Sequence, residues 1–241
     1  MEDFVRHLRS EAFAGLDVSG HVPDTHGWMD EKFSTVVIAA LQPLPRTAPL
    51  VIVEVGTWKG KSAMTMGHIC QIMGFSDASI VAVDTWLGAP EFWTWGLGDA
   101  TRGVALGRVN GYPSVFYTFT KNVKAAGLDA IIAPLPLSSI QGAYVLAHYR
   151  LAADLIYVDA AHEYEAVIAD LRAYYPLLKP GGALLGDDFM ENWPGVKRAV
   201  QEFAQEQGLE LRLDGVVWTL RQPQSSCWSR PGTSTASDGR I

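Results

Sequence analysis

Short runs of aliphatic and β-branched residues alternate with helix-like stretches along most of this chain, and this alternation constrains the fold more than any other feature. The first run covers residues 50–56, and further runs occur at 79–84, 130–133, 154–159 and 183–187. Continuous apolar runs of this length are typical of strands that are buried on both faces. Because helical patterns separate these runs, the sequence predicts a mostly parallel sheet with helices on both faces.

The end of the pattern differs from the rest. Two closing strands, near 209–213 and 216–220, are separated by Asp214-Gly215, which is a strong hairpin signal. The predicted fold class is therefore α/β, a Rossmann-like doubly wound sheet with an antiparallel edge. Helices are expected near residues 4–16, 30–41, 61–73, 163–178 and 195–207, and one more is expected to end at Gly127. Pro180-Gly181-Gly182 would terminate the helix at 163–178.

Three regions are predicted. Residues 1–48 would form a helical lid or substrate segment, 49–221 the main domain, and 222–241 a disordered tail rich in Ser, Pro, Gly and Thr. No internal repeat is visible.

Composition excludes several classes of protein. The chain has 241 residues, of which 48% are hydrophobic, so disorder throughout is excluded. With 19 basic and 26 acidic residues the net charge is −7, which argues against a nucleic-acid partner. Two cysteines, Cys70 and Cys227, are too few for a disulfide framework. No apolar run is long enough for a membrane span, and Met1–Phe4 lacks signal-peptide features, so a cytoplasmic protein without membrane contact is expected.

The loop after the first strand is the first candidate for ligand binding. It runs from Glu54 to Ser62, and Gly56 and Gly60 permit a tight turn and the close approach of a ligand to the backbone. Trp58 replaces the second glycine of the dinucleotide fingerprint, and the spacing of a P-loop is absent. A purely structural turn is the alternative.

Asp84 ends the second predicted strand, 28 residues after Gly56. An acid at this place in a doubly wound sheet can accept the hydroxyl groups of a ribose. The alternative is a helix cap or a solvated loop residue.

The fourth and fifth strands end in acids as well. Asp159 follows one of them and Asp187-Asp188 the other, so neighbouring parallel strands would bring three carboxylates together. Such carboxylates suit a hard cation such as Mg²⁺, Mn²⁺ or Ca²⁺. His162 could reach the same space and act as a general base. The alternatives are a helix cap at Asp159, a hydrogen-bonded loop histidine and a solvated turn.

Four aromatic residues crowd the segment behind Asp84, namely Trp86, Phe92, Trp93 and Trp95. Their rings could stack on a sugar or another ring, with a lid from His21 to Trp28 closing over them. Packing of a long surface loop or of a subunit contact explains them equally well.

Taken together, these motifs resemble those of the class I S-adenosylmethionine-dependent methyltransferases. The resemblance covers roughly residues 50–220 and rests on Glu54-x-Gly56-x-x-x-Gly60, Val81-Ala82-Val83-Asp84, Asp159-Ala160-Ala161-His162-x-Tyr164-Glu165, Lys179-Pro180-Gly181-Gly182 and Asp187-Asp188. Within that class the chain looks most similar to metal-dependent small-molecule O-methyltransferases that act on catechol-like substrates and macrolide sugars. The resemblance implies a seven-stranded sheet with a reversed last strand.

The resemblance also implies roles for individual residues. Glu54, Gly56 and Gly60 would line the methionine part of the cofactor, Asp84 would hold its ribose, and residues 135–139 would cover its adenine. The further cofactor contacts implied are Thr57, Ser62, Thr85, Trp86, Ser138 and Asp159.

By the same similarity Asp159, Asp187 and Asp188 would bind a divalent cation, most simply Mg²⁺, and His162 with Asp159 would be catalytic. Catechol-type enzymes commonly have a Lys as base and an Asn as the last ligand. The His162 and Asp188 found here favour the sugar-modifying branch.

The resulting hypothesis is an O-methyltransferase that uses S-adenosylmethionine, with a small hydroxylated molecule as substrate and no nucleic acid or membrane as partner. A nicotinamide-dependent oxidoreductase on a similar sheet and a non-catalytic binding protein of the same fold are the alternatives. Methylation of a protein, the identity of the acceptor and a homo-oligomeric state are left open by the sequence.

Overall fold

The computed structural model describes residues 2–94 and 105–223. Trp95, Cys227 and nearly all of the predicted tail lie outside these ranges. The elements are α1 (Glu2–Phe13), α2 (Phe33–Leu41), β1 (Leu50–Val55), α3 (Lys61–Ile72), β2 (Ala78–Asp84), α4 (Glu91–Thr94), α6 (Val115–Ala125), β3 (Ile132–Pro136), α7 (Ser139–His148), β4 (Ala153–Val158), α8 (Tyr164–Tyr174), the 3-10 turn η2 (Tyr175–Leu177), β5 (Leu178–Gly186), α9 (Pro194–Gln207), β6 (Glu210–Asp214) and β7 (Val217–Arg221).

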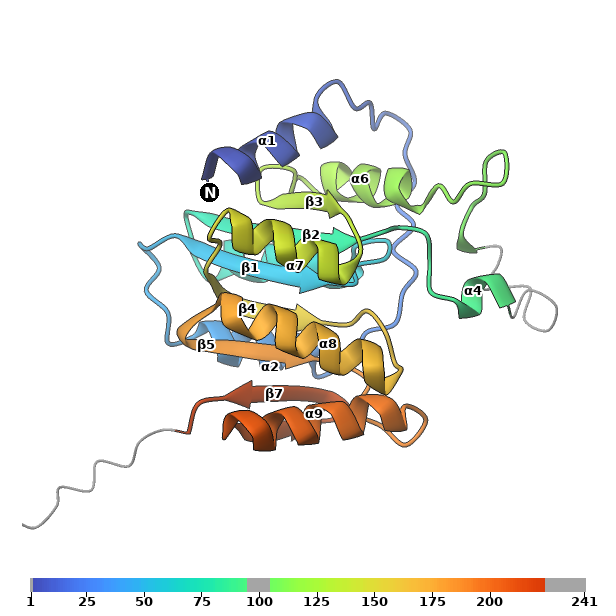
Figure 1. Cartoon of the computed structure of the whole chain (residues 1–241). Coiled ribbons are helices and arrows are strands. Elements are labelled where there is room, and N and C mark those ends of the chain that lie inside the picture. The colour runs from blue at the N-terminus through green and yellow to red at the C-terminus, as the bar shows by residue number, and fades with distance from the viewer. Residues whose placement is uncertain (1, 95–104, 224–241) are drawn as a thin grey trace, which may run out of the picture.

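Within the described residues, seven strands form one sheet in the order β3-β2-β1-β4-β5-β7-β6. Strands β1 to β5 pair in parallel, whereas β7 runs antiparallel to both β5 and β6 (Figure 1). The predicted doubly wound sheet, its reversed last strand and the hairpin at Asp214-Gly215 are therefore confirmed. Between β1 and β4 the strand order changes direction, which in open α/β sheets is where ligands bind.

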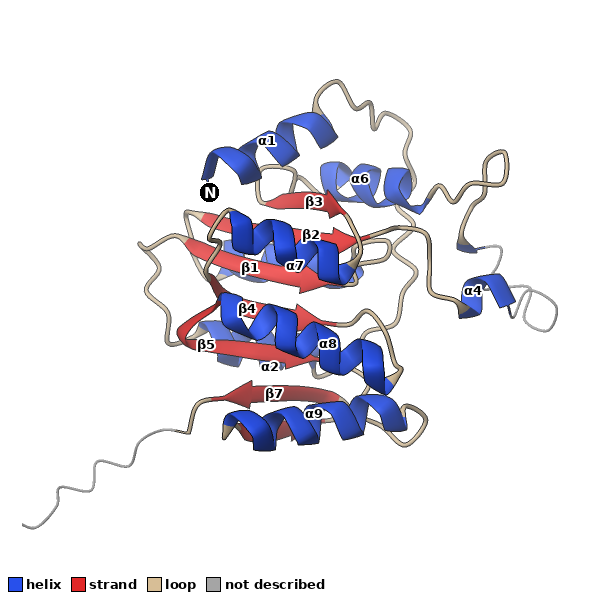
Figure 2. Cartoon of the chain, in the orientation of Figure 1, coloured by secondary structure: helices blue, strands red, loops and turns tan. Residues whose placement is uncertain are grey.

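Both faces of the sheet are covered by helices (Figure 2). Successive residues of a strand point to opposite faces, so Ile52 and Ile80 pack against α2, α3 and α6 while Val53 and Val81 pack against α7, α8 and α9. This two-sided burial explains why β1 is apolar at every position except Glu54, since all six of its residues are buried.

The third strand lies further along the chain than predicted. The expected strand at 130–133 gives way to a turn that ends at Ile131, and β3 extends to Pro136 instead. Two prolines fit there because β3 is an edge strand. A backbone N–H on its unpaired side would make no hydrogen bond within the sheet, so its absence in proline costs none.

Two helix predictions also need correction. The helix expected at 163–178 ends at Tyr174, and Pro180-Gly181-Gly182 lies inside β5, beside a register shift in its pairing with β4. The helix expected from Asp30 begins at Phe33. Helix α7, which begins after its cap Ser138, was not predicted from the sequence.

The N-terminal segment has two parts. Helix α1 covers the β3 edge, where Val5 and Phe13 are buried, and its Arg9 donates a hydrogen bond to the Ala130 carbonyl. Residues 17–32 then cross the carboxyl ends of the strands without regular structure. None of the helices in the described part of the chain combines the length and apolarity needed to cross a membrane.

Candidate functional site

A cavity of about 960 Å³ lies at the carboxyl ends of the parallel strands, a size typical of small-molecule sites. The loops after β1, β2, β3, β4 and β5 contribute to its wall, together with the N-terminal segment. Of the predicted site residues, those that line it are Gly56, Thr57, Ser62, Asp84, Thr85, Ser138, Asp159, His162, Asp187 and Asp188.

Asp84 joins the loops that follow β1 and β2. Its Oδ2 accepts hydrogen bonds from the backbone N–H groups of Thr57 (2.9 Å) and Trp58 (2.8 Å), and its Oδ1 accepts one from Trp86 (2.6 Å). A carboxylate offers about four acceptor positions, so these contacts leave room for about one further donor. Asp84 is thus both an organiser of the backbone and a candidate ligand group.

The two loops held by Asp84 contain strained backbone. Trp58 and Trp86 have positive φ angles of 50° and 54°, which non-glycine residues adopt at a cost of about 1–3 kcal/mol each. Their rings secure this conformation, because Trp86 Nε1 donates to the Trp58 carbonyl (2.8 Å) and Trp86 packs against Phe116 and Phe119. The expected cofactor contact at Trp86 therefore falls behind the cavity wall, where the side chain is 2% exposed.

Glu54 lies beneath the loop after β1 and is completely buried. The hydroxyl groups of Thr57 and Ser62 both donate to its carboxylate. Burial raises the pKa of Glu54 to about 7, and the nearby charge of Asp84 acts in the same direction. Glu54 supports the loop from below, and Gly60, the residue before α3, likewise lies behind the wall against Phe119.

Asp159 and Asp187 lie side by side, as predicted for the ends of neighbouring strands. The Tyr157 hydroxyl bridges them, at 3.2 Å from Asp159 Oδ2 and 3.3 Å from Asp187 Oδ2. Burial is the largest cause that raises the pKa of both acids, that of Asp159 well above its ordinary value; the charges of Asp187 and Asp188 add to it at Asp159, and those of Asp188 and Asp30 at Asp187. The backbone N–H of Asp188 donates to Asp187 Oδ1 (2.9 Å) and, with the nearby backbone of Asp30, partly opposes the rise in the pKa of Asp187.

Asp188 faces His162 rather than the other two acids. Its Oδ2 lies 2.9 Å from His162 Nε2, and the imidazole stacks on Trp193 with the ring centroids 3.9 Å apart. Asp188 itself has a φ of 65°. In the described part of the chain no three His, Cys, Asp or Glu side chains are grouped so that they could hold a metal ion.

The segment from His21 to Trp28 is tied to the loop after β1. Asn122, which is buried, donates to the carbonyl groups of Asp24 (2.7 Å) and Lys59 (3.0 Å) and accepts from the Asp24 backbone N–H (3.1 Å). Lys59 Nζ pairs with Asp24 Oδ2 at 2.6 Å. Trp28 reaches the cavity wall at the end of this segment.

The three predicted aromatic residues that the structure describes, Trp86, Phe92 and Trp93, have different environments, and Trp95 lies outside the described ranges. Phe92 lines the cavity and contacts Trp58 and Trp28. Trp93 is half exposed and packs under the Arg108 guanidinium, whereas Trp86 belongs to the core. The packing interpretation thus holds for Trp86, whereas stacking of Phe92 on a ligand remains a prediction.

Several residues at the site were not singled out from the sequence. Tyr157 precedes Asp159 by two positions and so points to the same face of β4. Asp170 is a charged residue on the apolar side of α8, a detectable signal because Val167, Leu171 and Tyr174 share that side. Asp30 and Asn122 carry no comparable signal, since their contacts depend on the path of the N-terminal segment.

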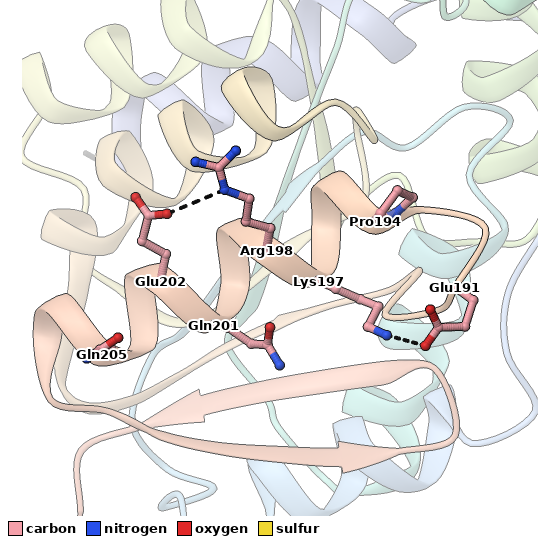
Figure 3. A pocket seen from close by; sticks show the side chains of 7 residues that line it. All are labelled: Glu191, Pro194, Lys197, Arg198, Gln201, Glu202 and Gln205. Atoms are coloured by element: carbon pink, nitrogen blue, oxygen red, sulfur yellow. Dashed lines mark hydrogen bonds and ion pairs between the residues drawn. The ribbon is translucent and has the colours of Figure 1, made fainter.

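A second hollow lies on the outer face of α9, away from the strand ends (Figure 3). Its charged side chains pair with one another, Lys197 with Glu191 and Arg198 with Glu202. Such a self-compensated surface offers no convergent groups for a ligand.

Comparison with known proteins identifies a family. The profile of a family described as "Methyltransferase domain" matches residues 53–189, more than half of the chain. No curated protein matches this chain in sequence.

Solved structures provide further similarities. The O-methyltransferase NovP is 24% identical, with 80% of this chain and 78% of that chain covered and a TM-score of 0.56. The calicheamicin methyltransferase CalS11 is 20% identical, with 78% and 76% covered and a TM-score of 0.58. An O-methyltransferase from Bacillus cereus in complex with SAH is 12% identical, with 91% and 97% covered and a TM-score of 0.55. At these identities the similarity is one of fold.

The buried Glu54 predicts a specific pH dependence of stability. Between about pH 4.5 and 7 the folded chain keeps a proton on Glu54 that the unfolded chain releases, so this group makes folding less favourable as the pH rises. In the wild type, Glu54 should lower the free energy of unfolding by on the order of 3 kcal/mol as the pH rises through that range. We expect Glu54→Gln to lack this decrease. Urea unfolding of the ligand-free proteins at pH 5 and pH 8 measures the free energy of unfolding at each pH. The matched variant Glu165→Gln, at an exposed position of α8, should keep the wild-type dependence, and identical pH profiles for all three proteins would contradict the prediction.

Proposed function

The chain belongs to the methyltransferase-domain family, and from this premise we propose that it transfers the methyl group of S-adenosylmethionine to a hydroxyl oxygen of a small molecule. One observation carries the proposal: the glycine loop after β1, the acid after β2 and the acids after β4 and β5 border a single cavity. A sugar or another natural-product moiety is the proposed class of acceptor.

The cavity has suitable groups for such a cofactor. Asp84 offers its remaining acceptor capacity to a ribose, and Gly56 exposes backbone at the start of the loop. Leu137 and Ser138 border the end of the cavity beyond β3, where the adenine is proposed to lie. When bound, S-adenosylmethionine supplies a methyl group that is already activated by its sulfonium.

His162 is proposed as the general base. It would accept the proton of the acceptor hydroxyl as the new O–CH3 bond forms and the S–CH3 bond breaks. Trp193, which stacks on the imidazole, fixes its orientation, and such positioning of a catalytic group contributes to the rate.

A divalent cation, most simply Mg²⁺, is proposed at Asp159, Asp187 and Asp188. The chemistry of the donors supports it, because oxygen ligands suit hard cations and the raised pKa values of Asp159 and Asp187 reflect burial together with neighbouring carboxylate charges, which a cation would offset. Binding would have to replace the contact between Asp188 and His162. A bound cation would supply electrostatic stabilisation of the deprotonated acceptor oxygen.

Aromatic side chains at the mouth of the cavity support a sugar or ring as acceptor. Trp28 and Phe92 lie edge to face, with their centroids 6.2 Å apart, and the faces of such rings suit stacking on sugars. CalS11 is described as a TDP-rhamnose 3′-O-methyltransferase, and its apo structure has a TM-score of 0.51 to this chain. We extend the sugar acceptor to this chain as part of the proposal.

The first test is binding of the cofactor. We expect S-adenosylhomocysteine and S-adenosylmethionine to bind in isothermal titration calorimetry, and Asp84→Asn to weaken both by about 10- to 100-fold, because the amide loses charge and one acceptor. Asp77→Asn, at the opposite end of β2 in an exposed turn, serves as the matched control. Absence of binding to the wild type would overturn the proposed function.

The second test concerns the base. His162→Gln should lower the single-turnover rate of methyl transfer by about 10²- to 10⁴-fold without changing the Kd of S-adenosylhomocysteine, because the side chain acts on the acceptor. An acceptor is first found by screening hydroxylated sugars and natural products with labelled cofactor. His148→Gln, on the exposed end of α7, should retain the full rate, and an unchanged rate in His162→Gln would remove His162 from the mechanism.

The third test concerns the cation. Asp187→Asn is expected to abolish the stimulation of turnover by Mg²⁺ or Mn²⁺ while leaving the affinity for S-adenosylhomocysteine within a few fold of wild type, since a carboxylate ligand is lost. Asp214→Asn, exposed on β6, is the control. Full wild-type activity in the presence of a chelator would refute the metal requirement.

A further inference from the structure

Tyr157 is a buried residue at the site that the proposed mechanism does not use. It lies in β4, two positions before Asp159, and its side chain is fully buried. Its hydroxyl group is 3.2 Å from Asp159 Oδ2 and 3.3 Å from Asp187 Oδ2. A single side chain of the core thus contacts two of the three acids at which the cation is proposed.

The Tyr157 hydroxyl reaches the two acids from the core side. Asp159 and Asp187 border the cavity, whereas Tyr157 has no exposed surface. Its ring packs edge to face against the buried ring of Phe33 in α2, with the centroids 4.9 Å apart. The hydroxyl therefore lies behind the carboxylates and leaves their cavity side open to a ligand.

The sheet fixes the position of this hydroxyl. Strand β4 lies between β1 and β5 in the sheet, so Tyr157 belongs to a central strand. The ladder between β4 and β5 ends with the pair Val158 and Gly186. Asp159 and Asp187 lie just beyond that pair, so the ladder does not hold their side chains. Because side chains in close-packed cores have little room to move, the phenol provides a fixed point between the two acids.

One hydroxyl proton is shared between two acceptors here. Both distances are longer than the usual value of about 2.7–2.8 Å for a hydrogen bond between two oxygens, as is expected when one donor serves two oxygens. At neutral pH a tyrosine hydroxyl keeps its proton, so it contributes a donor and no charge. Tyr157 therefore orients the two acids without supplying the positive charge that a cation would bring.

Groups that hydrogen-bond to the ligands of a metal orient those ligands and increase the affinity of the site. Resting on the proposed cation site, we infer that Tyr157 is a positioning residue for the divalent cation. Its hydroxyl holds Asp159 and Asp187 in the arrangement that binds the ion, and Tyr157 itself does not touch the ion. Asp188 faces His162 instead, so the pair held by Tyr157 is the part of the site that is already arranged.

The first experiment measures the affinity for Mn²⁺. Isothermal titration calorimetry of Mn²⁺ into the full chain saturated with S-adenosylhomocysteine gives the Kd of the ion. We expect Tyr157→Phe to raise this Kd by about 10- to 100-fold, because a hydrogen-bond partner of two metal ligands is lost. An unchanged Kd would overturn the inference. A lower Kd would overturn it as well, because it would show that the hydroxyl competes with the cation.

Tyr174→Phe is the matched control. Tyr174 is as fully buried as Tyr157, and its hydroxyl donates to the Ser139 carbonyl at 2.7 Å, between α8 and the start of α7. This variant also loses a buried hydroxyl with its hydrogen bond, but it should keep the wild-type Kd for Mn²⁺. An equal rise of the Kd in both variants would assign the effect to a general loss of packing and overturn the inference.

The wild type separates this inference from the proposed function. A wild type that binds S-adenosylhomocysteine but not Mn²⁺ would overturn the cation site and the role of Tyr157, while the proposed methyl transfer would stand. A wild type that binds neither would overturn the proposed function itself.

A second measurement applies even if Tyr157→Phe does not fold. In wild type labelled with ¹³C at the tyrosine Cζ atoms and saturated with S-adenosylhomocysteine, the Tyr157 resonance is assigned through the contact of its ring with Phe33. Addition of Mg²⁺ should shift this resonance, because both acceptors of the hydroxyl then bind a cation, and the Tyr174 resonance should stay in place. A Tyr157 resonance that is unchanged at saturating Mg²⁺ would overturn the inference.

Discussion

The cavity depends on the hydrogen bonds that the carboxylate of Asp84 accepts from the backbone. Parallel strands end in loops that share no backbone ladder, so an additional group has to hold those loops together. Asp84 does this by accepting three backbone N–H groups, two from the loop after β1 and one from the loop after β2. Hydrogen bonds to an ionised acceptor are about twice as strong as neutral ones, which helps to maintain the positive φ angles of Trp58 and Trp86. The proposed ribose ligand would thus bind to a residue that already organises the backbone.

The same end of the sheet concentrates carboxylates whose ionised form is disfavoured. The pKa values of Glu54, Asp159, Asp170 and Asp187 are all raised, with burial as the largest cause in each case. Each of these acids lowers the stability of the ligand-free fold at neutral pH, and perturbed acids of this kind cluster at functional sites. Their environments differ, however: hydroxyl groups satisfy Glu54, another acid lies beside Asp159, and one oxygen of Asp170 has no hydrogen-bond partner among the described residues. The first arrangement supports a loop, whereas the second is the one that we propose binds a cation.

Most of the sheet was predictable from the sequence because its central strands are buried on both faces. The runs that became β1, β2 and β4 are nearly uninterrupted, and the acids that follow them had to meet at one edge once the strands were parallel. The edge strand β3 was predicted at the wrong residues because its prolines weaken the strand pattern. Helix α7 was missed because its pattern is weaker than those of the two predicted strands on either side of it. Asp30 and Asn122 could not be predicted, since their contacts bring together residues far apart in the sequence. Tyr157 and Asp170 could have been found by following side-chain periodicity along β4 and α8.

The N-terminal segment connects these features mechanically. Asn122 and Lys59 fix Asp24 over the loop after β1, and six residues later Asp30 lies close to Asp187, the residue that follows β5. The Asp30 carboxylate also packs on Gly215, where a Cβ atom would come within 3.0 Å of its Oδ1. One stretch of chain therefore touches the loop after β1, the acid after β5 and the β6–β7 hairpin. The wall formed by Trp28 and the surroundings of Asp187 therefore depend on this stretch of chain, whereas α1 and α2 on either side of it pack against the sheet itself.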